Sequence, residues 1–514
     1  MEDTEREKVL EDILQGVDDN VQAQDALNQS TLEQFIRAMK IPTNIKGEQT
    51  QPFQWQYGLE EFKETFSKTK ESTSYGPSGL HMSHWKASLE RECISELHAF
   101  FIWAAFQFSF VYKRWEVSWH VVLKKKKFPF SQKLRIIQLF KADFNGGLKY
   151  LMGRKLMWHA TTEGILDSDT YGSRIGKTAP EAVLNLQMIF DDSRLWKKTK
   201  AMLFNDADGC YDRIAPVLGE IAVRRLGCPA SIANTVTKTL HKMKHHIKIS
   251  MGILLGYISF SKENKTVIEN GMIMLLAGLI GGSGQGSGAS PIIWLAILLI
   301  MIKVYKMTNS GVSIKNLVNK TIIQYFILSY VDDNTIMKTF DEKDSVEEIL
   351  NSMKKSLLEW NHLLQITGGA LSLPKCKVSI LQWKKNYWGL KQPILDSDDK
   401  TIKITAESNG GRLEALERLG PNKAEQVLGL RLPMTGAMDS EYKYRKKQIE
   451  NMALKLYQAL ISQKEAFLIY QTRYRLTISY CLPITVFSEE ELHSIQKKFI
   501  FLLLPKMGLN RHTP

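Results

Sequence analysis

The sequence Tyr330-Val331-Asp332-Asp333 lies between two apolar runs, residues 322–328 and Thr335-Ile336-Met337. An apolar run, an acidic tip and a second apolar run predict a β-hairpin with both aspartates at its turn. Adjacent carboxylates at the tip of a buried hairpin repel each other, and a divalent cation can neutralise them. The stretch therefore indicates a magnesium site. Because composition alone can produce such a tetrapeptide in a long chain, the interpretation needs partners elsewhere in the sequence.

A further carboxylate follows a second expected strand. The apolar residues Ala201-Met202-Leu203-Phe204 lead directly into Asn205-Asp206-Ala207. Nucleotidyl transfer by the two-metal route needs carboxylates from separate elements around cations about 3.5–4 Å apart. Asp206, Asp332 and Asp333 would supply that set.

A glycine-rich stretch, residues 281–291, precedes the apolar run 292–300. Five glycines in its first eight residues let the backbone approach a ligand closely, and the apolar run predicts a buried helix. A glycine-rich loop that enters a helix favours contact with a phosphate or a nucleotide. The spacing of its glycines matches neither the dinucleotide fingerprint nor the P-loop.

These three features resemble the polymerase core of reverse transcriptases, specifically those of non-LTR (LINE-type) retrotransposons, in a variant similar to protist elements. In that family motif A carries Asp-x5-Asp, motif B reads Gln-Gly-x3-Ser-Pro, and motif C reads Tyr/Phe-x-Asp-Asp. The chain has Asp206 and Asp212, then Gln285-Gly286 with Ser290-Pro291, then Tyr330 to Asp333. Their common order is far more specific than any one motif.

The resemblance extends from about Ser72 to Gly429. It rests on five further stretches. Thr73 to Leu80 is similar to the segment that opens the fingers, Lys124 to Lys127 with Lys133 to Ile137 to the basic fingers motif, and Tyr171 to Thr178 to the segment before motif A. Gly368-Gly369 with Leu373 to Lys377 is similar to motif D, and Val427 to Leu430 to the primer grip. Serine stands at Ser78, where the family usually has aspartate, and at Ser173, where it usually has phenylalanine.

The resemblance implies an α+β, right-hand polymerase fold with fingers, a palm built on an antiparallel sheet, and a helical thumb. We expect an N-terminal helical extension over residues 1–70, fingers over 71–200, a palm with motifs A to E over 201–430, and a thumb over 431–514. Relatives of this kind continue beyond such a point, so we expect the chain to be part of a longer element. No endonuclease, ribonuclease H or zinc-knuckle pattern is visible in it.

The resemblance also implies roles for individual residues. Two Mg²⁺ ions, which Mn²⁺ could replace, would be held by Asp206, Asp332, Asp333 and the carbonyl of Ala207, and Lys375 would protonate the leaving pyrophosphate. The expected nucleotide-binding residues are Arg135 and Lys127 at the triphosphate, Tyr211 against the sugar 2′ position, and Gln285 and Gly286 in the pocket. The expected template and primer contacts are Lys124, Lys125, Lys126, Arg174, Leu428 and Gly429. The partners would be an RNA template, a DNA primer and deoxynucleoside triphosphates.

The charge distribution agrees with a polyanionic ligand. The chain has 68 Lys and Arg against 54 Asp and Glu, a net charge of +14, and the stretch from Lys113 to Lys155 holds twelve basic and two acidic residues. Binding through such a surplus should weaken steeply with salt. The run Lys124 to Lys127 could instead be a nuclear-localisation signal or a solvated charge run.

Several segments indicate an intracellular protein, nuclear or cytoplasmic, with no membrane span. Five dispersed cysteines without a Cys-x2-Cys pair favour a reducing compartment and no zinc module. No signal peptide is visible in Met1 to Asn28, whose apolar spacing predicts an amphipathic helix. The uncharged run from Gly271 to Ile302 is interrupted by glycines and a proline, so its apolar halves are too short to span a bilayer.

Three other helices are predicted from pattern. The histidines within Lys238 to Lys248 are interspersed with lysines and favour a basic helix over a metal site. Ser345 to Glu348 is a capping box, and Val346, Ile349, Met353, Leu357 and Trp360 then mark one apolar helix face. The spacing of Ile449, Met452, Leu456 and Leu460 predicts helices in the C-terminal segment, which holds twelve basic against six acidic residues from Ser440 onward.

Two other classes of function stay open. One is a different templated polymerase, either an RNA-dependent RNA polymerase or a maturase-type intron enzyme; the bulk of Tyr211 argues against RNA synthesis, which must admit the 2′-hydroxyl. The other is a domesticated or inactive nucleic-acid-binding remnant. Taken singly, Asp206 could be a helix N-cap, Asp332-Asp333 a turn, and the glycine-rich stretch a flexible connection.

Overall fold

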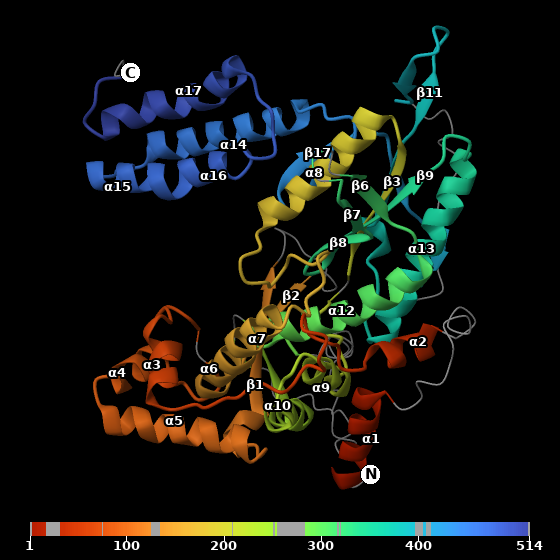
Figure 1. Cartoon of the computed structure of the whole chain (residues 1–514). Helices are drawn as coiled ribbons and strands as arrows, with labels where there is room; N and C mark the ends of the chain where they lie inside the picture. Colours follow the sequence, from red (N-terminus) through yellow and green to blue (C-terminus); the bar gives the residue numbers. More distant parts are fainter. Residues whose placement is uncertain are drawn as a thin grey trace. The chain divides into compact units, whose positions relative to one another are not determined.

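The computed structural model describes residues 3–16, 31–74, 76–124, 134–207, 209–249, 252–253, 283–315, 318, 320–395, 405–407 and 413–511. The chain forms two compact units. Unit 1 contains Met1–Gly176, Ala207–Asn309 and Leu358–Ser372, and unit 2 contains Lys177–Asp206, Ser310–Leu357 and Leu373–Pro514. Each unit combines helices with small sheets, which agrees with the α+β prediction (Figure 1).

Unit 1 is mainly helical. Its described α-helices are α1 (Asp3–Gln15), α2 (Thr31–Ala38), α3 (Leu59–Ser67), α4 (Met82–Ser88), α5 (Glu92–Gln107), α6 (Ala142–Tyr150), α7 (Met157–Thr162), α9 (Pro216–Arg225), α10 (Ala230–Lys242) and α12 (Ser290–Thr308), with shorter turns η2 (Lys113–Glu116) and η4 (Leu151–Leu156). Leu10 and Leu14 are buried along α1, which confirms the amphipathic helix for the described part of the N-terminal segment.

Helix α12 is the core helix of unit 1. Pro291 lies in its first turn, where a missing N–H leaves no helical bond unmade, and every side chain from Ile292 to Ile302 is buried. It packs against α2, α9 and η4. Within the described residues α12 is the one helix long and apolar enough to span a membrane, but 72% of that window is buried inside the protein, as in the core helix of a soluble protein.

Unit 1 also holds a four-stranded sheet with the order β2-β1-β4-β5, formed by β1 (Val117–Lys124), β2 (Leu134–Leu139), β4 (Lys244–Ile249) and β5 (Gly252–Ile253). The helix predicted over Lys238 to Lys248 is wrong in its second half, because α10 ends at Lys242. His245 and Ile247 are buried while Lys244 and His246 are half-buried, so burial alternates with the two-residue period of a strand. Parallel pairing of β4 with β1 is what overrides the helical spacing.

Unit 2 is built on a five-stranded sheet with the order β15-β10-β3-β9-β8, whose strands are β3 (Thr199–Asp206), β8 (Ile327–Tyr330), β9 (Asp333–Phe340), β10 (Lys377–Leu381) and β15 (Glu417–Leu419). The central strand β3 pairs antiparallel with both β9 and β10. The strand predicted over residues 201–204 and the hairpin that carries the aspartates are therefore confirmed.

The apolar run 322–328 forms two strands instead of one. Its first half, β7 (Ile322–Tyr325), pairs with β6 (Val312–Lys315), and its second half enters the five-stranded sheet as β8. The first three residues of β7 are exposed, whereas the first three residues of β8 are buried. Apolar composition alone could not show where the core begins.

The remaining elements of unit 2 are hairpins and helices. The hairpins are β11 (Trp383–Lys385) with β12 (Lys391–Pro393), β13 (Thr405–Glu407) with β14 (Leu413–Ala415), and β16 (Glu425–Val427) with β17 (Leu430–Leu432). The helical segments are α8 (Ala179–Trp196), η5 (Leu373–Lys375), α14 (Asp439–Gln458), α15 (Gln463–Ile469), η6 (Tyr470–Tyr474), α16 (Arg475–Ser479) and α17 (Glu489–Lys506), and α13 (Val346–Ile366) begins in this unit.

Two helical predictions are confirmed here. In the capping box before α13, the Ser345 N–H donates to Glu348 Oε2 at 2.7 Å, and the Glu348 N–H donates to Ser345 Oγ at 3.2 Å. Ile449 and Leu456 of α14 are buried in one apolar cluster with Phe499 of α17. Leu460, by contrast, lies beyond the end of α14 and is fully exposed.

Candidate carboxylate site and glycine-rich loop

Strand pairing in unit 2 brings the three predicted aspartates together. Asp206 is the last residue of β3 and lies directly opposite Asp333, the first residue of β9. Residues opposite each other in an antiparallel pair project from the same face of the sheet, so both carboxylates leave the sheet at one edge. Asp332 precedes Asp333 in the turn from β8, where Val331 has a left-handed φ of +62°. One hairpin and its neighbouring strand thus position all three carboxylates.

The charges of these groups act on one another. Asp333 lies at an exposed tip, but loss of hydration around its carboxyl, together with the negative charges of Asp332 and Asp206, raises its pKa to about 6, against a smaller lowering effect of Lys375. A cation bound beside Asp333 would favour its ionised form and offset the two neighbouring negative charges. Mg²⁺ and Mn²⁺ prefer hard oxygen ligands, and these three carboxylates supply ligands of that kind.

Lys375 supplies a positive charge at this site. It ends η5, 58% of its side chain is exposed, and its ammonium group donates to Asp206 Oδ2 in an ion pair. Among the described residues, no group of three or more His, Cys, Asp or Glu side chains is already arranged to hold a metal ion. The Asp206 carboxylate is turned toward Lys375, so cation binding would require this ion pair to loosen.

The glycine-rich loop in unit 1 is held by the segment that follows Asp206. The Gln285 N–H donates to Asp212 Oδ1 at 3.2 Å, and the Gly284 N–H donates to the Tyr211 carbonyl at 3.3 Å. From the sheet of this unit, the Gln138 N–H donates to the Gln285 carbonyl at 2.7 Å. The predicted nucleotide-binding residues Tyr211, Gln285 and Gly286 therefore lie together.

Asn145 of α6 is a further residue at this loop that the sequence did not indicate. Its side-chain amide donates to the Gly286 carbonyl at 3.0 Å, and its Oδ1 accepts from the Gly288 N–H at 2.6 Å. Asn145 therefore holds the loop backbone at two positions, Gly286 and Gly288. The one local signal was Asn145-Gly146-Gly147, three weak helix formers in succession inside a helix.

Close backbone approach explains one glycine of the loop. Gly286 has a φ of +128°, and a Cβ there would lie 2.3 Å from the Gln138 carbonyl oxygen. No other residue type fits that position without displacing β2.

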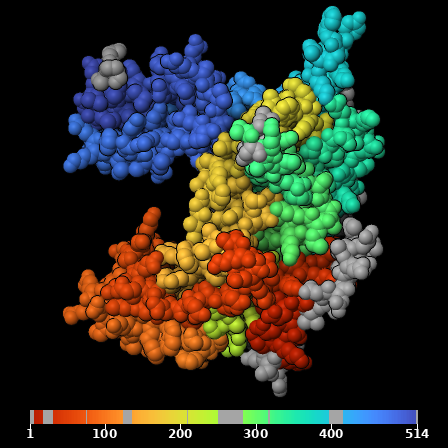
Figure 2. Space-filling model, viewed as in Figure 1, coloured from red at the N-terminus to blue at the C-terminus, as the bar shows by residue number. Residues whose placement is uncertain are grey.

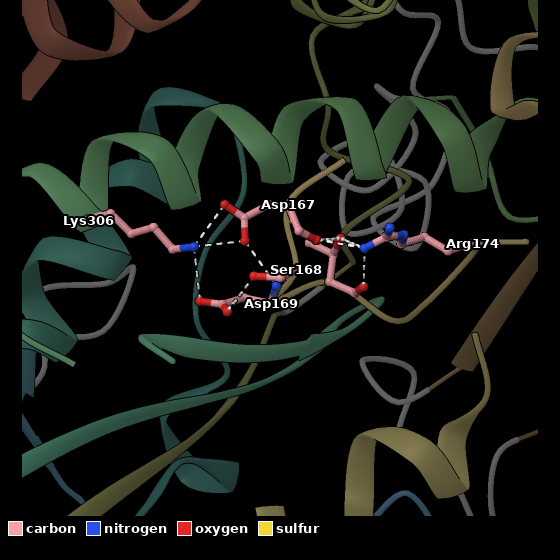
Figure 3. Close-up of polar contacts among 6 residues, drawn as sticks. Asp167, Ser168, Asp169, Arg174 and Lys306 are labelled. Atoms are coloured by element: carbon pink, nitrogen blue, oxygen red, sulfur yellow. Dashed lines mark hydrogen bonds and ion pairs between the residues drawn. The ribbon is translucent and has the colours of Figure 1, made fainter. Parts of the chain in front are cut away.

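Arg174, predicted to contact the template, is used inside unit 1. Its Nη1 donates to the Asp167 carbonyl at 2.7 Å and to the Thr170 carbonyl at 2.9 Å. On the other side of the same loop, Lys306 of α12 reaches both Asp167 and Asp169 (Figure 3). Arg174 therefore positions the loop that contains Asp167 and Thr170, and a template contact stays a prediction.

The other predicted residues have defined places in the chain. Lys124 ends β1 and Arg135 lies in β2, which pairs antiparallel with β1, while Lys125, Lys126 and Lys127 lie outside the described residues. Ala207 is buried in unit 1 and forms an isolated bridge with Leu371.

The predicted primer-grip residues form the β16–β17 turn of unit 2. Leu428 and Gly429 have left-handed φ values of +48° and +88°. The Tyr480 hydroxyl donates to the Leu428 carbonyl, and Arg445 Nη2 donates to the Gly429 carbonyl at 2.9 Å. Arg445 of α14 and Tyr480, which directly follows α16, thus fix the position of this turn.

Two buried histidines, His120 and His245, contact Gln138, whose backbone N–H holds the glycine-rich loop. The sequence did not indicate this pair. His120 Nε2 and His245 Nδ1 are 2.8 Å apart, and the Gln138 amide lies 3.3 Å from the same Nδ1. Burial lowers the pKa of His120 to about 4 and holds the pKa of His245 well below its usual range. Both rings are therefore neutral at pH 7, and Gln138 connects them to the loop.

The four predicted catalytic residues, Asp206, Asp332, Asp333 and Lys375, belong to unit 2, whereas Tyr211, Gln285 and Gly286 belong to unit 1. Comparison with known proteins adds no family to this description: no protein-family model matches the chain, and no curated protein matches it.

Proposed function

We propose that the chain is a reverse transcriptase of the non-LTR retrotransposon type, an RNA-directed DNA polymerase with a right-hand fold that extends a primer on an RNA template. The observation that carries the proposal is the pairing of Asp206 opposite Asp333, with Asp332 beside them and the pKa of Asp333 raised to about 6. Such crowding of negative charge on a sheet edge is costly without a cation, which favours a functional site over a structural one.

In this proposal Asp206, Asp332 and Asp333 hold two divalent cations. When bound, such cations supply Lewis-acid activation of a hydroxyl and stabilise a leaving pyrophosphate. Lys375, released from Asp206, would donate a proton to that leaving group. Tyr211 would exclude the 2′-hydroxyl, and Gln285 and Gly286 would line the nucleotide pocket with a backbone that Asn145 and Asp212 hold in place.

A second candidate is supported by one contact. The ion pair between Lys375 and Asp206 already neutralises part of the site, as it would in a domesticated protein that binds nucleic acid without catalysis. An RNA-dependent RNA polymerase is supported less well, because the resemblance implies that Tyr211 lies against the sugar 2′ position, which RNA synthesis must leave open. Tyr211 does not distinguish a maturase-type enzyme from the proposed reverse transcriptase.

The test is primer extension on an RNA template with deoxynucleotides and Mg²⁺, using the parent and an Asp332→Asn, Asp333→Asn double variant. Asp341→Asn is the matched control, because Asp341 is an exposed aspartate that directly follows the other end of β9. We expect extension by the parent and the control and none by the double variant. A folded parent that binds primer and template without extending it would reject the enzyme in favour of the nucleic-acid binder.

A further inference from the structure

The β11–β12 hairpin of unit 2 carries exposed aromatic side chains at its tip. Tyr387 is 94% exposed and Trp388 is 79% exposed, and their rings meet edge to face with centroids 5.2 Å apart. Large aromatic groups are normally withdrawn from water, and Figure 2 shows this hairpin, in cyan, projecting from the surface around it. Such exposure is typical of a binding surface.

The tip has a defined backbone. Asn386 Oδ1 accepts from the Trp388 N–H at 3.0 Å and from the Leu390 N–H at 2.9 Å, and the Asn386 N–H donates to the Leu390 carbonyl at 2.8 Å. Gly389 completes the turn with a φ of +74°. The two rings are therefore presented by an ordered turn, which lowers the entropy lost when a ligand stacks on them.

The base of the hairpin is fixed to the residues that directly follow helix α8. Trp383 Nε1 donates to the Lys198 carbonyl at 3.1 Å, and Lys197 Nζ lies 4.4 Å from the centre of the Trp383 ring. Lys391 forms an ion pair with Glu342. These contacts attach the strands to the body of unit 2 and leave the tip to face solvent.

The charge of the hairpin selects its ligand. From Trp383 to Pro393 the hairpin has three lysines and no acidic residue. Lys384 and Lys385 are exposed, and they take part in no ion pair with the residues that the structure describes. A protein or lipid partner chosen by aromatic burial alone would not need this uncompensated charge. Aromatic faces beside lysines match a polyanion that offers flat rings, which is single-stranded nucleic acid.

We propose that Tyr387 and Trp388 form a stacking platform for the bases of single-stranded nucleic acid, with Lys384 and Lys385 contacting the phosphates. A duplex keeps its bases stacked inside and offers no ring to this platform, so a single strand is the preferred ligand. The platform is separate from the carboxylate residues and needs neither Mg²⁺ nor nucleotide, so it can be tested whether or not the chain is a polymerase.

The first test is binding of fluorescein-labelled 15-nucleotide oligo(U) and oligo(dT), measured by fluorescence anisotropy without Mg²⁺. For a Tyr387→Ala, Trp388→Ala variant we expect at least a fivefold loss of affinity, since one stacked base contributes roughly 5- to 150-fold. A Tyr387→Phe, Trp388→Phe variant should retain binding because its rings still stack. Phe108→Ala is the matched control, because this aromatic residue is 67% exposed and lies in unit 1.

The second test locates the contact. Trypsin cleaves after Lys385 and after Lys391 and releases the hexapeptide 386–391, which carries both rings. Oligonucleotides that contain 5-iodouracil should cross-link to this peptide under near-ultraviolet light, as mass spectrometry would show. Unchanged affinity of the double alanine variant, or cross-links on other peptides only, would overturn the proposal. A double alanine variant that loses as much affinity for a blunt 15-base-pair duplex as for the single strands would overturn it as well.

Discussion

Replacing Lys306 with methionine should destabilise unit 1 strongly. The Lys306 ammonium lies 2.7 and 2.8 Å from the two carboxylate oxygens of Asp167 and 3.1 Å from Asp169 Oδ2. Asp169 is completely buried, whereas Lys306 and Asp167 keep about a quarter of their side chains exposed. The variant therefore removes the positive charge of Lys306 from beside one buried carboxylate.

The size of the effect follows from this burial. Removing one partner of a buried ion pair costs about 3–5 kcal/mol, and the partial exposure of Lys306 and Asp167 places the loss near the lower end, at about 3 kcal/mol. Methionine keeps most of the apolar stem of lysine, so packing changes little. Adding Asp169→Asn to the Lys306→Met variant removes the buried negative charge, and this second change should restore about half of the lost free energy of unfolding.

Urea unfolding followed by circular dichroism gives the change in free energy, and hydrogen exchange in peptides that cover residues 165–175 locates it. Lys355→Met serves as the control, because Lys355 is an exposed residue of α13, and it should change the stability by less than about 0.5 kcal/mol. A Lys306→Met variant within about 1 kcal/mol of the parent, or one that Asp169→Asn makes still less stable, would refute the reasoning.

Three further predictions concern the loop, the histidines and the nucleotide. In urea titrations, Gly286→Ala should lower the free energy of unfolding by about 2 kcal/mol more than the control Gly176→Ala. A Cβ at Gly286 would meet the backbone of β2, whereas a Cβ at Gly176 would meet nothing within 4 Å. Equal losses of stability in the two variants would contradict this prediction. The pKa of His120 is 6.5 in the unfolded chain and about 4 in the folded protein, so burial of the neutral ring stabilises the fold fully above pH 6.5, and about 3 kcal/mol of stability is lost as the pH falls to 4. His120→Gln should make this loss of stability smaller, and an equal loss would show that other groups cause it. If the chain is a polymerase, Tyr211→Val should raise the ratio of ribonucleotide to deoxynucleotide kcat/KM by about tenfold or more, and an unchanged ratio would remove Tyr211 from the sugar pocket.

The sequence predicted local elements well wherever one pattern controlled them. The two apolar runs on either side of Asp332 and Asp333 predicted the hairpin, and the apolar run after Pro291 predicted the buried helix α12. The capping box at Ser345 gave the start of α13. In each case the residues that decide the structure lie within a few positions of one another, so propensity and burial agree.

Features that depend on distant partners could not be read from the sequence. The alignment of Asp206 with Asp333 depends on strand register, which only the folded sheet fixes. Asn145 brackets a loop 141 positions away, and no local pattern reports that. His245 entered a strand instead of a helix because β1, far away in the chain, supplied its hydrogen-bonding partner.

Binding of a divalent cation is the most direct test of the central claim that Asp206, Asp332 and Asp333 form a metal site. Titration with Mn²⁺, followed by the electron paramagnetic resonance of the free ion, measures binding without requiring catalysis. The account predicts saturable binding by the parent and the Asp341→Asn control that is lost in an Asp206→Asn, Asp333→Asn variant of unchanged circular dichroism. Equal Mn²⁺ binding by the parent and that variant would contradict it.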